Sequence, residues 1–534
     1  MTAEQFHAAL VGGLLRAAEA LCEASPFLMC GLIVAAVFRR LVGHAGVRTL
    51  FGDDSRTGLL RAWAVGMLLP VDALGVLPVI RELRKAGLKG GTILAFALSA
   101  PLFNPLSLLY GLTLSDPAAV LAFAVGSLIV VTSAGLLWDR LFPGTVAVED
   151  PPPAPVQQGA KRLAAVAVAG AREASGGAVP LVLIALAGPL LLGIVVPKGF
   201  LSTAVNGENP FAPLVTTAVA IPAYASPMAA MGTVGSMFQH GNSVGAAFAM
   251  LVLGAGTTLG LLAWAWRTYG LGRTAALLGA VAGVTLALSY GIDRPLRPAG
   301  AEEGGHTHAF DGYTAPFAAT SPPADPWARA WTELVDGAEV HERYALVALA
   351  AFVLMGLALR VADRPGRVEA WLERPPAEDA EAQPIGRFDV ALPAPVLGGV
   401  ALVGLAAISV LGCFTYYPPP GECLDDLNVM QTEALIAANT GDAARAAEFI
   451  PVCEDWAKRA QVGYVLRNGP AGEFRELRTA LYLDRLELLE HELAHQAAES
   501  KLDDPAEQAI RRELVGRIGR SFGRLRQAYD PDRN

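Results

Sequence analysis

A single carboxylate stands between two prolines in a run that is otherwise apolar. Residues 70–78 read PVDALGVLP, with Asp72 near the centre. An aspartate at bilayer depth costs roughly 2.5 to 3.5 kcal/mol, so it usually marks a functional site or a satisfied structural role. Asp72 can bind a cation or take up a proton. It can also cap a helix that restarts after a break at Pro70, since aspartate accepts hydrogen bonds from free backbone donors.

The composition around this motif is that of a membrane protein. The chain has 534 residues, of which 53% are hydrophobic and 17% charged, a balance that soluble proteins of this length rarely reach. A spanning helix needs about 20 mostly apolar residues. The sequence predicts eight spans, at residues 26–43, 91–113, 117–139, 178–197, 244–266, 272–291, 344–361 and 393–412.

The two ends of the chain differ from this apolar middle. Residues 1–25 lack the basic start and the cleavage site of a signal peptide, and charged residues interrupt their apolar positions at helical spacing, which predicts an interfacial amphipathic helix. Residues 413–534 hold 36 of the 91 charged residues of the chain. This enrichment predicts a separate soluble helical domain.

The apolar part contains an internal repeat, divided by the Pro-rich linker at 143–160. Gly87 pairs with Gly241 and Gly91 with Gly245, both 154 residues apart, and at the same offset Phe103-Asn104 falls on Thr257-Thr258. Four arginines between residues 39 and 56 precede the segment 58–80, and four basic residues between 81 and 89 follow it. Since basic residues mark the cytoplasmic side, this segment is predicted to enter the membrane and return.

The equivalent segment 212–238 has flanks that are poor in Lys and Arg, which predicts that they face outward. The two halves would then run in opposite directions, as inverted repeats with discontinuous helices that meet at the binding site. A pair of ordinary kinked spans is the alternative.

The chain resembles the predicted permeases that include the bacterial organoarsenical efflux permeases. The resemblance covers roughly residues 20–290 and rests on Pro26 and Gly31, the tip PVDALGVLP, the basic turn RELRKAG and the helix AFALSAPLFNP. It implies a permease fold and secondary transport. Those exporters carry two cysteines in the tip where this chain has Asp72 and Leu74. Soft trivalent arsenicals prefer thiolates, whereas a carboxylate prefers hard cations or protons.

Polar residues of the broken segments are the expected contacts of a substrate or coupling ion. A water-accessible cavity at the tip would bring them together. They are Asp72, Ser99, Asn104, Tyr224, Ser226, Thr257 and Thr258.

Two further motifs contain potential metal ligands. The loop GGHTHAFDGY offers His306, His308 and Asp311, a set that suits one divalent ion such as zinc or copper, although a polar loop that happens to be rich in histidine fits as well. The tail contains HELAH at 491–495, which matches a zinc hydrolase pattern. It lies in a charged helix with frequent Glu and lacks the Gly turn and third ligand of the extended pattern, so we interpret it as an accidental match.

The sequence therefore predicts an all-α polytopic membrane protein, an inverted-repeat permease with two re-entrant or broken helices and a helical soluble C-terminal domain. Its function would be secondary transport of a small solute or ion, with metal or metalloid efflux as one form. The other classes are a membrane-anchored metal-binding or sensory protein, and a zinc hydrolase. No enzymatic activity is expected. The predicted divisions are 1–142, 143–160, 161–291, 292–342, 343–412 and 413–534.

The expected setting is the bacterial inner membrane, with several spans and with the C-terminal domain in the periplasm. Membrane lipid and a small solute or ion are the expected partners, together with further copies of the chain, and nucleic acid is not. A disulfide between Cys423 and Cys453 would suit an oxidising compartment.

Overall fold

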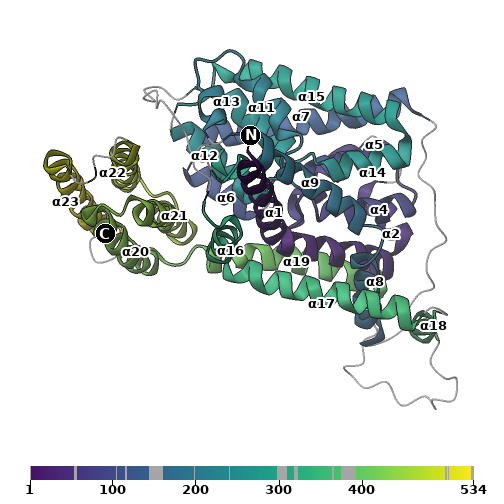
Figure 1. Cartoon of the computed structure of the whole chain (residues 1–534). Coiled ribbons are helices and arrows are strands. Elements are labelled where there is room, and N and C mark those ends of the chain that lie inside the picture. Colours follow the sequence, from purple (N-terminus) through teal and green to yellow (C-terminus); the bar gives the residue numbers. More distant parts are fainter. Residues whose placement is uncertain are drawn as a thin grey trace. The chain divides into compact units, whose positions relative to one another are not determined.

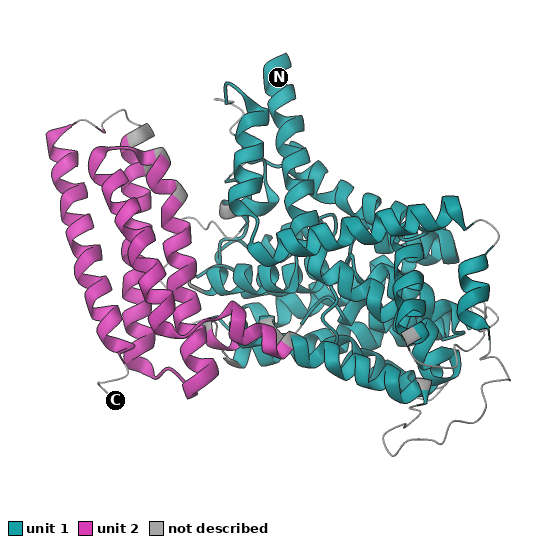
Figure 2. Ribbon diagram, turned by 90° about the horizontal axis from the view of Figure 1, so that it is seen from below, with its two compact units in different colours: residues 1–111, 115–409 teal, residues 112–114, 410–534 magenta. Residues whose placement is uncertain are grey.

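The computed structural model describes most of the chain. The described residues are 2–52, 57–103, 105–114, 117–143, 160–197, 199–239, 241–297, 310–317, 323–363, 366–374, 393–498, 502 and 504–530. Their regular elements are helices, which form two compact units (Figure 2). Unit 1 holds residues 1–111 and 115–409, and unit 2 holds residues 112–114 and 410–534. The all-α membrane fold is thereby confirmed.

The first helix is longer than the sequence predicts. α1 runs from Ala3–Val37 and continues through a π-helix, Phe38–Val42, into α2, Gly43–Phe51. Residues 3–25 are therefore not a separate helix but belong to the same helix as the predicted first span. Pro26 lacks the amide that would bond to Cys22, but the Ser25 hydroxyl donates to the Cys22 carbonyl at 2.8 Å. This local partner lets the helix continue past the proline.

The rest of the first half contains two interrupted helices. Residues 69–75, here called the first tip, separate α3 from α4, and residues 100–104 separate α5 from α6. The bounds are α3 Gly58–Leu68, α4 Val76–Lys85, α5 Gly90–Ser99, α6 Pro105–Leu114 and α7 Pro117–Leu141.

The second half carries the same elements in the same order. Residues 221–226, here called the second tip, separate α11 from α12, and residues 256–258 separate a π-helix from α14. The bounds are α8 Ala160–Ala174, α9 Val179–Val195, α10 Phe200–Ala204, α11 Ala212–Ala220, α12 Pro227–Gln239, α13 Val244–Ala249, the π-helix Met250–Ala255, α14 Leu259–Tyr269 and α15 Leu271–Asp293.

Glycines that are 154 residues apart also have equivalent backbone conformations and equivalent contacts. Gly87 and Gly241 both have positive φ, 82° and 63°. The amide of Gly91 donates to Asp139 Oδ1 at 2.9 Å, and the amide of Gly245 donates to Asp293 Oδ1 at 2.8 Å. The two aspartates lie on α7 and α15, again 154 residues apart. In space α1 packs against α9 and α7 against α15 (Figure 1), so equivalent helices of the two halves meet.

The prediction of eight continuous spans is wrong in detail. Among the described residues, five helices are long and apolar enough to cross a membrane, or up to seven if each bent pair counts as one span. The expected spans 91–113 and 244–266 are both interrupted, the second by a bend of 57°. Hydropathy misses such breaks because the residues on either side remain apolar.

Helices that follow the two halves pack on α1 and α8. α16 and α17 contact α1, and α17 and α18 contact α8. The short helix η3 precedes them and lies beside α9. The bounds are η3 Asp311–Tyr313, α16 Pro326–Gly337, α17 Val340–Ala362, α18 Arg367–Glu373 and α19 Ala394–Tyr416.

Unit 2 is a helical domain with its own apolar core. Its helices are α20 Pro420–Thr440, α21 Ala443–Asn468, α22 Glu473–Ala498 and α23 Pro505–Ala528. Cys423 and Cys453 are free thiols buried in this core, so the structure lacks the disulfide considered above. Both side chains pack among apolar neighbours such as Leu486 and Leu489.

Candidate binding site where the two tips meet

Asp72 holds the turn that leads from the first tip into α4. Its Oδ1 accepts the amides of Leu74 at 3.1 Å and Gly75 at 2.5 Å, and its carbonyl accepts the amide of Val76 at 2.9 Å. The carboxylate thus satisfies donors at the start of a helix, where negative charge is favoured. The side chain is completely buried. Asp72 therefore has the helix-capping role that the sequence suggested. Its second carboxylate oxygen, Oδ2, remains available to another partner.

That partner comes from the second tip. The Tyr224 hydroxyl donates to Asp72 Oδ2 at 2.7 Å. Two residues later, the Ser226 hydroxyl donates to Glu23 on α1 and accepts the amide of Ala229 at 3.1 Å. Ser226 occupies the position equivalent to Asp72 at the offset of 154 residues. Both tips thus place a side-chain oxygen at the start of the following helix, but only the first places a carboxylate there.

Glycines let the two long helices approach the tips. A Cβ on Gly31 of α1 would lie 2.6 Å from the carbonyl carbon of Gly75, and one on Gly188 of α9 would lie 2.9 Å from that of Pro222. Either contact is closer than two carbon atoms tolerate. The second tip is also fixed by the amide of Ala225, which donates to the Gly254 carbonyl of the π-helix at 3.2 Å.

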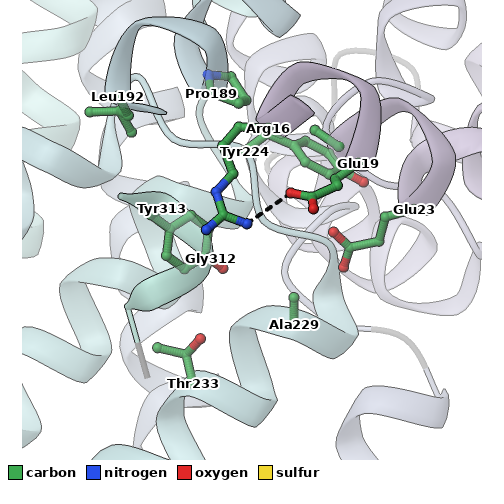
Figure 3. Close-up of a pocket in the computed structure, with 11 residues that line it drawn as sticks. Arg16, Glu19, Glu23, Pro189, Leu192, Tyr224, Ala229, Thr233, Gly312 and Tyr313 are labelled. Carbon is green, nitrogen blue, oxygen red and sulfur yellow. Dashed lines mark hydrogen bonds and ion pairs between the residues drawn. The ribbon is translucent and has the colours of Figure 1, made fainter. Parts of the chain in front are cut away.

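A cavity of about 240 Å³ lies beside this cluster. Figure 3 shows Arg16, Glu19 and Glu23 of α1 around it, opposite Tyr313. The other lining residues are Ala20, Pro189, Leu192, Tyr224, Ala229, Thr233 and Gly312.

Arg16 fixes one wall of the cavity. Its guanidinium pairs with Glu19 at 2.8 Å and donates to the carbonyls of Asp311 at 2.8 Å and Thr314 at 3.0 Å. It thereby ties the segment 310–317 to α1. The bond from Arg16 to Asp311 is made to the backbone carbonyl of that residue.

The carboxylates near the cavity differ in whether a cationic side chain balances their negative charge. Glu19 has Arg16 as its cationic partner. Glu23 and Asp72 bond to hydroxyl and amide groups, and neither has an arginine or lysine partner within the described part of the chain. A buried carboxylate without a cation is costly unless it takes up a proton or binds a positive ion. The arrangement can therefore bind a proton or a small hard cation.

The other residues of the predicted site lie in the broken helices. Ser99 ends α5, and its hydroxyl bonds to the Phe96 carbonyl at 3.2 Å. Thr258 precedes α14, where its hydroxyl accepts the Leu261 amide at 3.3 Å. Thr257 is buried, and its hydroxyl has no hydrogen-bond partner among the described residues. Asn104 lies outside the described residues. Within the described ranges, no hydrogen bond joins Ser99, Thr257 or Thr258 to Asp72, so of the predicted residues Tyr224 and Ser226 extend the cluster around it.

The metal site expected at His306, His308 and Asp311 stays a prediction. His306 and His308 lie outside the described residues, and the described part of the chain contains no cluster of three His, Cys, Asp or Glu side chains suited to a metal. The HELAH motif lies in α22, where Glu492 accepts a hydrogen bond from Gln496 at 2.6 Å. Gln496 in turn accepts one from the buried Arg511 at 2.7 Å. The motif's glutamate thus belongs to a polar network inside unit 2.

Glu23 is the site residue that the sequence analysis missed. The sequence pattern places Glu23 in an interfacial helix, where a glutamate faces water. Its position three residues before Pro26, next to a continuous apolar run, is the feature of the sequence that indicates burial.

The comparisons with known proteins point to one family. The chain is 28% identical to the UPF0718 protein YcgR of Bacillus subtilis (strain 168) over 88 residues, which are 16% of this chain and 30% of that relative. The matched stretch thus spans less than a third of the relative's length. No solved structure matches the chain. Residues 14–293, which contain both tips and the helices that hold them, match the predicted permease family over slightly more than half of the chain. This protein therefore belongs to the predicted permease family.

Proposed function

We propose that the protein is a secondary transporter of the bacterial inner membrane that couples movement of a small solute or ion to binding of a proton or cation at Asp72 and Glu23. The observation that carries this proposal is the hydrogen bond from Tyr224 of the second tip to Asp72 of the first, at 2.7 Å. A carboxylate buried between two helix breaks is typical of an ion-coupling site.

The coupling follows from the charge state of the cluster. When each carboxylate has taken up a proton or bound a cation, Asp72 and Glu23 are neutralised and the tips pack together. Release of these ions leaves two negative charges in a buried site, which favours entry of water and separation of the tips. Ion binding and the packing of the two halves therefore depend on each other, which is what coupled transport requires.

The repeated architecture supports this mechanism. Equivalent helices meet at α1 and α9 and again at α7 and α15. We infer that the halves are inverted repeats and that rocking of one against the other exposes the tips to either side in turn. In this arrangement the tail domain is periplasmic. No catalytic step is assigned to the protein.

The side chains of the tip favour a hard coupling ion. Asp72 and Glu23 offer oxygen ligands, and the nearest donors, Tyr224 and Ser226, also carry oxygen. Oxygen ligands suit protons and hard cations, whereas a trivalent arsenical prefers thiolates. The substrate itself is therefore sought first among metal ions and oxyanions, with organoarsenicals as the comparison set.

The test is the substitution Asp72→Asn. Asparagine keeps an acceptor for the Leu74 and Gly75 amides and keeps the size, but it removes the charge. Cells with and without the protein are first screened with metal ions, oxyanions and organoarsenicals to find a transported compound. In proteoliposomes, Asp72→Asn is then expected to be folded and inserted but to lose gradient-driven flux and its dependence on pH.

The matched control is Glu208→Gln, which neutralises a glutamate outside both tips. It should transport as the unaltered protein does. If a well-expressed Asp72→Asn protein transports as fast as the unaltered protein and with the same dependence on pH, the carboxylate serves the turn alone.

A further inference from the structure

Unit 1 contains a second cavity whose walls are basic. Its volume is about 530 Å³, and it lies between α4, the turn before α9 and the end of α14. Its lining residues are Arg81, Arg84, Lys85, Gly177, Pro180, Leu181, Trp264, Arg267 and Thr268. Four of these nine side chains are cationic, and none is acidic, so the cavity favours an anionic occupant.

Two of the four cations are left without an acidic partner. Arg81 pairs with Glu173 at 2.7 Å, and Lys85 pairs with Glu82 at 3.2 Å. Arg84 lies over the ring of Tyr269 at 5.8 Å. Over the described ranges, neither Arg84 nor Arg267 forms an ion pair. Two guanidinium groups are therefore available to a ligand in the cavity.

The fold does not require these charges. At the offset of 154 residues, the three basic residues of α4 correspond to Gly235, Phe238 and Gln239, and Arg267 corresponds to Thr113. The equivalent place in the other half is uncharged at all four positions. The four basic residues thus occur in one of the two equivalent places of the repeat and not in the other. This difference indicates that they have a function separate from folding.

A glycine makes room for one of the cations. Gly177 corresponds to Glu23 in the first half. A Cβ at Gly177 would lie 2.6 Å from Cζ of Arg81, so any side chain here would displace the guanidinium. The same position of the repeat thus carries a carboxylate beside the cavity at the two tips and leaves space for an arginine beside the basic cavity.

We propose that this cavity binds a phosphate group, supplied by an anionic membrane lipid. Arginine matches phosphate oxygens with two parallel hydrogen bonds, which a spherical chloride ion cannot accept in the same way. Trp264 lines the cavity, and Trp266, two residues further along α14, is 57% exposed. Tryptophan and tyrosine gather where spanning helices reach the lipid head groups, and basic pockets between such helices bind anionic head groups.

The test uses the purified full-length protein in detergent. Binding of phosphatidylglycerol is measured by native mass spectrometry against phosphatidylcholine, whose head group carries no net charge. Inorganic phosphate is added in a second arm as a competitor. The double variant R84Q/R267Q is expected to bind phosphatidylglycerol about 25-fold more weakly, which is about fivefold for each interfacial arginine.

The control variant is R140Q, which removes an exposed arginine at the end of α7 that does not line the cavity. It should bind as the unaltered protein does. If inorganic phosphate competes with the lipid, and this competition is lost in R84Q/R267Q, the cavity is a phosphate site. A soluble anion is then a second ligand of the site besides the lipid head group. Equal binding of both lipids, or equal binding by R84Q/R267Q and the unaltered protein, overturns the proposal. No outcome depends on transport.

Discussion

Substitution of Gly31 by alanine should disturb the first tip without touching its polar residues. The new Cβ would lie 2.6 Å from the carbonyl carbon and 2.7 Å from Cα of Gly75. Carbon atoms in contact settle at about 3.5 Å or more, so the turn must move by about 1 Å. Because these are backbone atoms, no rotation of a side chain relieves the clash.

Two responses are open to the protein, and both cost free energy. If the turn stays in place, overpacking costs about 1 to 3 kcal/mol. If Gly75 moves by about 1 Å away from Asp72, the bond from its amide to the carboxylate stretches beyond hydrogen-bond range, and a bond to a charged group is worth about 1.5 to 3 kcal/mol. We therefore expect a loss of about 2 kcal/mol at the tip.

Hydrogen exchange at residues 74–77 measures this loss directly. A loss of about 2 kcal/mol raises the equilibrium for local opening about 30-fold, and amide exchange should accelerate by the same factor. Gly279→Ala in α15 is the matched control, because a Cβ there meets nothing within 4 Å. It should leave exchange at the tip unchanged and stabilise its own helix by up to about 1 kcal/mol. Equal exchange at residues 74–77 in both variants would refute the argument.

Three further predictions concern other parts of the chain. Cysteines placed in 82–89 and in 150–158 should be shielded from an impermeant thiol reagent in intact cells, while one at 305 should react; labelling of 82–89 from outside contradicts the re-entrant topology. The loop with His306 and His308 should bind one divalent metal with an affinity that falls as pH drops through about 6.5, because the imidazoles must be neutral to coordinate; equal metal content in the protein and its double alanine variant removes this prediction. Burial raises the pKa of Cys423 and of Cys453 to about 12, so both thiols should resist alkylation at pH 8 until the tail unfolds. Because unfolded thiols ionise first, the tail should also lose stability as pH rises from about 9 towards 12; rapid labelling of the folded protein would contradict this.

Parts of this fold are readable from the sequence for clear physical reasons. Gly87 and Gly241 stand out because positive φ restricts a position to glycine, so the repeat could be aligned on them. The break near Asp72 was predictable because proline removes a backbone donor. The contact between Tyr224 and Asp72 was not, because nothing in either tip specifies which distant hydroxyl will reach it.

The broken helices show a different limit. Gly254 and Gly256 signal weakness in the span 244–266, yet glycine is common within spanning helices. Only packing decides whether such a helix bends. Here a Cβ on Gly256 would lie 3.1 Å from the Leu98 carbonyl of α5, so the second break sits against the end of the first broken helix. Such a meeting of two distant segments lies beyond any local pattern.

The unlike residues of the two tips bear on where the protein rests between transport cycles. In the inverted-repeat arrangement proposed above, two identical halves would give inward-open and outward-open states that are related by a two-fold axis and equal in free energy. Here one tip carries Asp72 and the other Ser226, so exchange of their roles does not restore the same interactions. The two states must then differ in population, and the prevailing proton or cation concentration sets the bias between them. Under the proposed mechanism, a directional preference is therefore built into the duplicated frame by carboxylates that lack a counterpart, Asp72 and Glu23.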